Sequence, residues 1–168
     1  EDVRKRIVDG QLAKWRQVEN HLDDMQHEIV AYLTRIYQSG VSESEAKELS
    51  SLMRMTNNIE RIGDSVENIA QAIEDMIESN LTFTEQAMAD MDKLVDKVAE
   101  FMDLIASAMR QRPANFMNRA DSLENAIDAM REKYRDDHIQ RLRSCECGID
   151  QGLVYVNLLT NLEKIGDY

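Results

Sequence analysis

Four pairs of acidic residues share the spacing Glu-x-x-x-Asp, and together they could supply oxygen ligands to a cation. Residues four apart lie on one face of a helix, so each pair would hold two carboxylates side by side. Two such pairs on neighbouring helices would form an all-oxygen site for a hard or borderline metal ion, and bridging carboxylates could hold several ions. The four pairs are Glu19 and Asp23, Glu60 and Asp64, Glu124 and Asp128, and Glu163 and Asp167.

These pairs stand out from the other acidic residues because they share one register in an internal repeat. The segment VENHLDDM at 18–25 matches LENAIDAM at 123–130, and NIERIGD at 58–64 matches NLEKIGD at 161–167. The two matches occur in the same order, at offsets of 105 and 103 residues. The two halves of the chain therefore align if the loop between the matched segments differs by two residues in length. We interpret the chain as a tandem duplication of a helical unit.

A glycine interrupts each of the matched heptapeptides, at Gly63 and Gly166. Glycine inside a helix costs about 0.5–1 kcal/mol relative to alanine. The absence of a side chain would let another backbone, or a bound ion with its waters, approach the neighbouring acidic pair. On a helical wheel Glu60 and Asp64 lie opposite the apolar residues of their helix, with Glu67 on the same polar face, so we expect shallow sites near the surface.

Apolar residues at helical spacing predict an all-α fold of tandem duplicated antiparallel bundles with five helices. The expected helices cover residues 2–38, 42–79, from a capping box at Thr82 to the RQRP segment at 110–113, from there to about 144, and 148 to the end of the sequence. Ser42 with Glu45, and Thr82 with Glu85, have the spacing of capping boxes at helix starts.

Composition narrows the class of protein. The 168 residues carry a formal net charge of −12, which argues against a nucleic-acid partner. No apolar run is long enough to span a membrane. Two cysteines in a Cys-x-Cys segment, Cys145 and Cys147, are too close for an easy mutual disulfide, and we expect a reducing, cytoplasmic setting.

Enzymatic alternatives lack their sequence motifs, and we predict that the chain is not an enzyme. A di-iron oxidase needs Glu-x-x-His on two helices, which the sequence does not contain. We expect surface roles for His21, His27 and His138. No phosphate-binding glycine loop and no zinc-protease motif is present. A metal-dependent oxidase or hydrolase remains a rival, and turnover lost in Glu60→Gln would favour it.

The repeated segments NIERIGDSVENIA at 58–70 and NLEKIGDY at 161–168, each preceded by a helix with Glu-x-x-x-Asp, resemble the PhoU family. Proteins of that family consist of two three-helix bundles and bind multinuclear iron or zinc clusters through such acidic motifs. The resemblance therefore implies two metal sites, one formed by Glu19, Asp23, Glu60 and Asp64, the other by Glu124, Asp128, Glu163 and Asp167. It also divides the chain into a first repeat at 1–80, with two long helices, and a second at 81–168, with three.

The resemblance implies a regulator of phosphate transport. Two features depart from the family: the first of six helices is missing, and the last helix stops after Asp167. We therefore expect the cytoplasmic tail of a sodium/phosphate cotransporter, held at the inner membrane by a transporter or by its own upstream membrane domain. A free-standing regulator of phosphate uptake and a metal-free helical interaction domain are the alternatives. The missing helix would leave residues such as Trp15 and Leu22 partly uncovered, so we expect homo-oligomers or an upstream helix that covers them.

Overall fold

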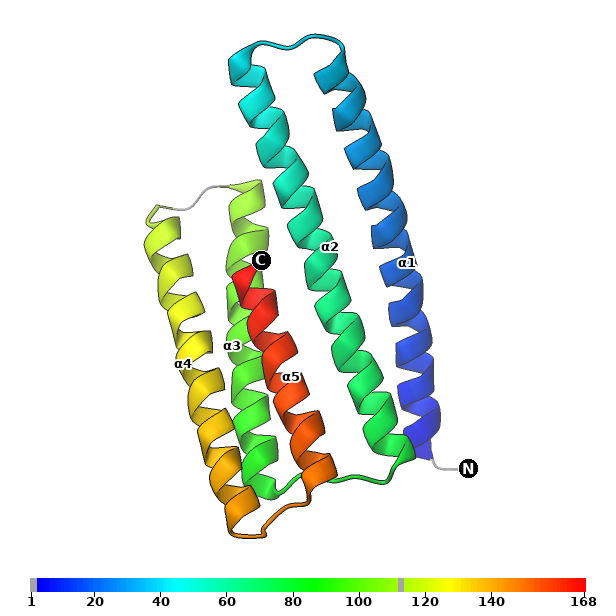
Figure 1. Cartoon of the computed structure of the whole chain (residues 1–168), viewed down its shortest axis with the longest axis vertical. Helices are drawn as coiled ribbons and strands as arrows, with labels where there is room; N and C mark the ends of the chain where they lie inside the picture. Colours follow the sequence, from blue (N-terminus) through cyan, green and yellow to red (C-terminus); the bar gives the residue numbers. More distant parts are fainter. Residues whose placement is uncertain (1–2, 112–113) are drawn as a thin grey trace. The chain divides into compact units, whose positions relative to one another are not determined.

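The protein was analysed as a computed structural model that describes residues 3–111 and 114–168. Five α-helices occupy these residues, and no β-strand occurs among them (Figure 1). The helices are α1 (Val3–Gln38), α2 (Glu43–Glu78), α3 (Glu85–Arg110), α4 (Phe116–Arg143) and α5 (Ile149–Asp167). The predicted all-α fold is confirmed.

The chain divides into two compact units, each described by itself. Residues up to Glu67, together with Tyr168, form the first, and Asn68–Asp167 form the second. The boundary falls within α2, not in the connection between α2 and α3.

The first unit is an antiparallel hairpin of α1 and α2. Its turn contains Gly40 at φ +88°, a backbone conformation that residues with a side chain rarely adopt. The predicted capping box begins α2: the backbone N–H of Ser42 donates to Glu45 Oε2 at 2.8 Å, and the backbone N–H of Glu45 donates to Ser42 Oγ at 3.4 Å. The hairpin is thus closed by local sequence alone.

Large apolar side chains of the hairpin remain exposed. Val18 is 49% exposed while its neighbour Glu19 is 7% exposed, the reverse of the usual preference. Trp15 and Leu22, which we expected to be partly uncovered, are half-buried. Besides Tyr32 and Tyr37, the exposed large hydrophobic side chains of the hairpin include Val18, Met25, Ile29, Leu52, Met55 and Ile59, and these last six are called the hairpin apolar set below.

The second unit is built on a three-helix bundle, in which α3, α4 and α5 each contact the other two. Its core contains Leu94, Ile127 and Leu159, all at most 1% exposed. The predicted capping box at Thr82 is wrong. Thr84 caps α3 instead, because its hydroxyl accepts from the backbone N–H of Ala87 at 3.2 Å.

A cluster of polar side chains is buried at the end of this bundle where α3 and α5 begin and α4 ends. Arg141 lies 3.6 Å from Asp90, and the His138 ring lies 4.9 Å from the Tyr155 ring. The predicted surface role of His138 is wrong, since its side chain is 2% exposed. Gly152 explains the difference: a Cβ there would lie 2.8 Å from His138 Nε2, so the glycine of α5 makes room for the ring. His21 and His27 are exposed, as predicted.

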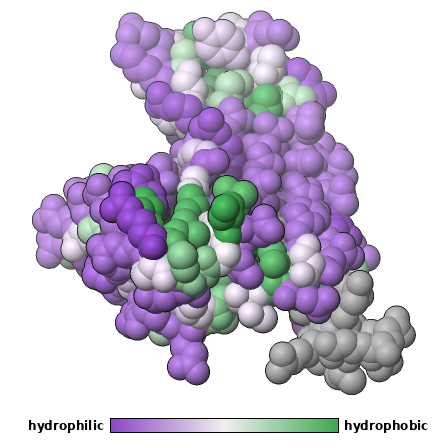
Figure 2. All heavy atoms as spheres, turned by 60° about the horizontal axis from the view of Figure 1, so that its bottom comes forward, coloured by the Kyte–Doolittle hydropathy of each residue, from purple (hydrophilic) through white to green (hydrophobic). Residues whose placement is uncertain are grey.

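The surface is mostly polar, with local apolar patches. Figure 2 brings forward the end of the second unit where α5 starts, and hydrophobic side chains gather there between hydrophilic ones. Ile149 and Leu153, in the first turns of α5, are 76% and 67% exposed. None of the helices in the described parts of the chain combines the length and apolar composition of a membrane span.

Candidate metal centres

Three carboxylates from both helices of the hairpin meet in the first unit. Glu19 of α1, and Asp64 and Glu67 of α2, each offer one oxygen, and these three oxygens lie within 4.8 Å of one another. We call these residues the first acidic cluster. Glu19 is buried, whereas Asp64 and Glu67 are exposed, so the group has a buried floor and an open outer side.

Glu19 lies in an unfavourable environment for a charge. The residue is 7% exposed, and no hydrogen bond or ion pair joins its side chain to another described residue. Its carboxylate oxygens are not among the fully buried atoms that lack a partner, so they keep some contact with solvent. Burial raises its pKa first, and the negative charges of four neighbouring acidic residues raise it further. These neighbours are Asp23, Glu67, Asp64 and Glu60. A bound cation would remove both penalties.

Asp23 and Glu60, both predicted ligands, flank this cluster without belonging to it. The pKa of Glu60 is raised by burial first, and then by the charges of Asp64 and of Asp23 across the hairpin. The structure therefore gathers all four acidic residues predicted for the first site into one electrostatic neighbourhood. Which of them would ligate stays a prediction.

Glu67 was not predicted as a member of this cluster, although the sequence held a signal for it. Glu60, Asp64 and Glu67 have the i, i+4, i+7 spacing of a single helix face. A search restricted to Glu-x-x-x-Asp excludes the third member of that face.

A second acidic cluster lies in the second unit. Asp128 of α4, and Glu163 and Asp167 of α5, offer oxygens within 4.8 Å of one another. Glu124, also predicted here, is half-buried on α4 and is not a member of this cluster. Asp167 has a raised pKa, because burial and the charges of Glu163 and Asp128 disfavour its ionised form.

This second cluster contains a cation of its own. Arg131 Nη2 donates to Glu163 Oε1 at 2.6 Å, in an ion pair whose side chains are 30% and 13% exposed. That hydrogen bond is the main cause of the raised pKa of Arg131, and the charge of Asp128 raises it further.

The two repeated glycines make room for side chains of the facing helix. A Cβ at Gly63 would lie 3.2 Å from Leu22 Cδ1, and one at Gly166 would lie 3.3 Å from Ile127 Cδ1. Neither a backbone nor an ion is needed to explain them, so that expectation is corrected. Leu22 and Ile127 are equivalent under the repeat, at the same offset of 105 residues. Each acidic cluster thus lies beside the same packing contact.

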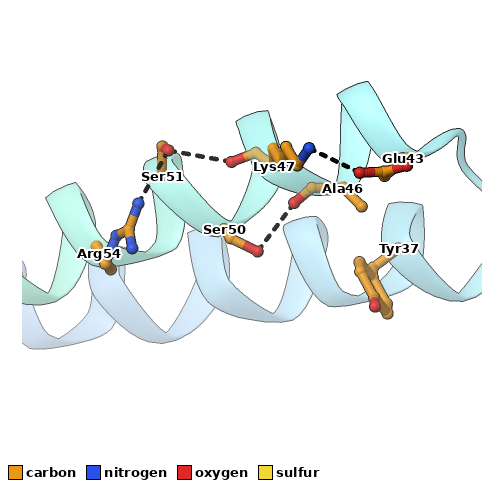
Figure 3. A pocket seen from close by; sticks show the side chains of 7 residues that line it. All are labelled: Tyr37, Glu43, Ala46, Lys47, Ser50, Ser51 and Arg54. Atoms are coloured by element: carbon orange, nitrogen blue, oxygen red, sulfur yellow. Dashed lines mark hydrogen bonds and ion pairs between the residues drawn. The ribbon is translucent and has the colours of Figure 1, made fainter.

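A shallow hollow near the hairpin turn has different chemistry. It is lined by Tyr37, Glu43, Ala46, Lys47, Ser50, Ser51 and Arg54 (Figure 3). The polar side chains that α2 contributes bond to one another or to that helix, as in the 2.7 Å ion pair of Lys47 with Glu43. The acidic clusters are therefore the stronger candidate sites.

The first cluster satisfies the chemical requirements of a cation site. Its donors are all carboxylate oxygens, the type that hard cations and several transition metals accept. The residues come from both helices, so an ion there would cross-link α1 to α2.

One of the comparisons with known proteins finds a similar family. Residues 6–73 match the family model described as PhoU domain. The match covers 68 of the 168 residues and shows that this segment is similar to a PhoU domain. The PhoU match contains Glu19, Asp64 and Glu67, the whole first acidic cluster, whereas the second cluster lies outside it. No curated protein and no solved structure matches the chain.

Proposed function

We propose that this chain is a regulatory domain that controls phosphate transport and binds metal ions at the first acidic cluster. One observation carries the proposal: Glu19 is only 7% exposed, has no hydrogen-bond or ion-pair partner among the described residues, and lies close to Asp64 and Glu67 inside the PhoU match. A structural carboxylate buried among like charges destabilises a fold unless something compensates it. A metal ion is the compensation that suits three converging oxygens.

The regulatory step that we propose follows from the position of the cluster. An ion held by both helices fixes the hairpin, while its absence leaves α1 and α2 repelling one another at this point. The metal state can thereby change how firmly the hairpin presents its surface to a partner.

The proposed partner is a phosphate transporter, either a separate protein or a membrane domain of the same polypeptide. Support comes from the hairpin apolar set, because large apolar side chains that remain exposed are candidates for interaction surfaces. A cytoplasmic sodium/phosphate cotransporter tail remains our preferred form, with a free-standing regulator as the alternative. The same set favours the second candidate, a metal-free interaction domain in which binding to a partner needs no ion.

We also propose that residues 81–168 form a second PhoU-like repeat. The pairing of Leu22 with Gly63, and of Ile127 with Gly166, places equivalent residues in equivalent contacts. A duplication explains this agreement more simply than independent origins do.

A metal-dependent stability measurement tests the proposal. Iron(II), zinc or manganese should raise the melting temperature of the wild-type protein, because a ligand that binds only the folded state stabilises it. Glu19→Gln should abolish the shift, and Glu28→Gln, which changes an exposed acid of α1 outside both clusters, should retain it. No shift in the wild type, together with unchanged phosphate uptake in cells carrying Glu19→Gln, would favour the metal-free interaction domain.

A further inference from the structure

The two acidic clusters differ in one respect that bears on metal binding. In the second, the guanidinium of Arg131 hydrogen-bonds to Glu163 at 2.6 Å beside Asp128. In the first, no ion pair joins a basic side chain to Glu19, Asp64 or Glu67 within the described part of the chain.

The repeat shows which residue takes the place of Arg131 in the first unit. The offset of 105 that aligns Leu22 with Ile127 aligns Gln26 with Arg131. Gln26 is neutral, and its side chain donates to Asn57 Oδ1 at 3.0 Å, so it bonds across the hairpin without touching the carboxylates of the cluster. One repeat therefore has a cation where the other has an amide.

We propose that Arg131 is a built-in cation that pairs with Glu163 of the second cluster, so that the protein binds metal only at the first. This inference rests on the proposed function, since it assigns the site of metal binding between the two repeats. It predicts an asymmetric protein: one half responds to metal ions, and the other keeps a permanent ion pair.

The geometry explains why the guanidinium would exclude an ion. Glu163 belongs to the group of three close oxygens, and it is the residue that accepts from Arg131. The guanidinium engages Oε1 of Glu163, which makes that oxygen less available to a metal ion, and an ion that approaches the cluster must also come close to a positive charge. Displacing such a charge-assisted hydrogen bond corresponds to a factor of about 10–100 in affinity.

A set of variants separates this inference from the proposed function, with Mn²⁺ and Zn²⁺ alone as probes and with calorimetry and metal analysis as readouts. Glu19→Gln should abolish binding. Glu19→Gln combined with Arg131→Gln should bind metal again, now at the second cluster, and adding Glu163→Gln should abolish it once more. Arg131→Lys in place of Arg131→Gln keeps the positive charge and should not restore binding.

A reciprocal substitution tests the same idea in the first unit. Gln26→Arg should weaken metal binding by the wild-type cluster by up to roughly tenfold, because it brings a guanidinium toward Glu60, the repeat equivalent of Glu163, which flanks this cluster. Gln26→Leu is the neutral control and should leave the affinity within a few-fold of the wild type.

Two results would overturn the inference. One is metal binding that survives Glu19→Gln and disappears on adding Glu163→Gln, because the second cluster would then bind despite Arg131. The other is a Glu19→Gln, Arg131→Gln protein that keeps its helical circular dichroism yet binds nothing. Failure of the proposed function is distinct: the wild-type protein itself would then bind no metal.

Discussion

Gly166→Ala should destabilise the protein by about 1–2 kcal/mol, although alanine favours helix. The new Cβ would lie 3.3 Å from Cδ1 and 3.7 Å from Cγ2 of Ile127, which is fully buried and β-branched and so has little freedom to move. Overpacking a core costs about 1–3 kcal/mol. The gain in helix propensity, at most about 1 kcal/mol, is reduced because Gly166 is the penultimate residue of α5.

Gly63→Ala, the equivalent change in the first unit, should stabilise the protein or leave its stability unchanged. Gly63 lies well inside α2, so alanine there gains the full propensity of about 1 kcal/mol. Its Cβ would meet Leu22 Cδ1 at 3.2 Å, but Leu22 is half-buried and its terminal methyl can rotate away. We expect Gly63→Ala to change stability by between 0 and about 1 kcal/mol in the stabilising direction.

A double-mutant cycle isolates the contact at Gly166. Ile127→Val deletes the Cδ1 atom and should cost about 0.5–1.5 kcal/mol alone. In combination with Gly166→Ala it removes the close approach, so the two changes should couple by at least about 1 kcal/mol. Urea denaturation followed by far-ultraviolet circular dichroism measures all four proteins, and fluorescence of Trp15, the single tryptophan, reports on the first unit. Additive effects, or a neutral Gly166→Ala, would refute the packing explanation of this glycine.

Further predictions concern the second unit. Burial, and after it the charge of Arg141, lowers the pKa of His138, so the folded protein favours the neutral ring. The contribution of His138 to the free energy of unfolding is fully present above the unfolded pKa of about 6.5. It is lost as the pH falls from there through the folded pKa. His138→Gln should therefore flatten the fall in stability just below pH 6.5, measured as urea midpoints at successive pH values. Arg141→Ala leaves Asp90 buried without its cation and should lower the free energy of unfolding by about 3 kcal/mol. A double variant, Asp90→Asn with Arg141→Met, should recover part of this loss in the same urea assay. Thr84→Ala should lower stability by about 1 kcal/mol in thermal unfolding while Thr82→Ala changes it little, because only Thr84 caps α3.

The arrangement of helices could be predicted from the sequence because local signals mark their ends. Ser42 with Glu45 formed the expected capping box, and Gly148 directly precedes α5. The error at Thr82 has a local cause: the chain offers threonines at 82 and 84, and residue types alone do not decide which hydroxyl meets a free N–H.

Burial in the hairpin could not be predicted from a helical wheel. A wheel assigns apolar residues to the inside, yet here Glu19 faces α2 and Val18 faces outward. A two-helix hairpin can bury only one narrow stripe of each helix, so the remaining apolar residues stay exposed. His138 was misjudged for a related reason, since its burial depends on Gly152 of another helix.

The candidate sites, too, were predictable from the sequence only in part. The shared register of the acidic pairs pointed to both clusters, because a repeat preserves which helix face a residue occupies. The role of Glu67, the exclusion of Glu124 and the ion pair of Arg131 each depend on contacts between helices. No spacing rule in the sequence contains that information.

The metal content of the protein tests the central claim most directly. Equilibrium dialysis against Mn²⁺ or Zn²⁺, followed by elemental analysis, should find bound metal in the wild type and in Glu28→Gln, and none above background in Glu19→Gln. Equal metal in all three proteins would show that binding occurs away from the buried carboxylate, and a metal-free wild type would show that the first acidic cluster holds no ion.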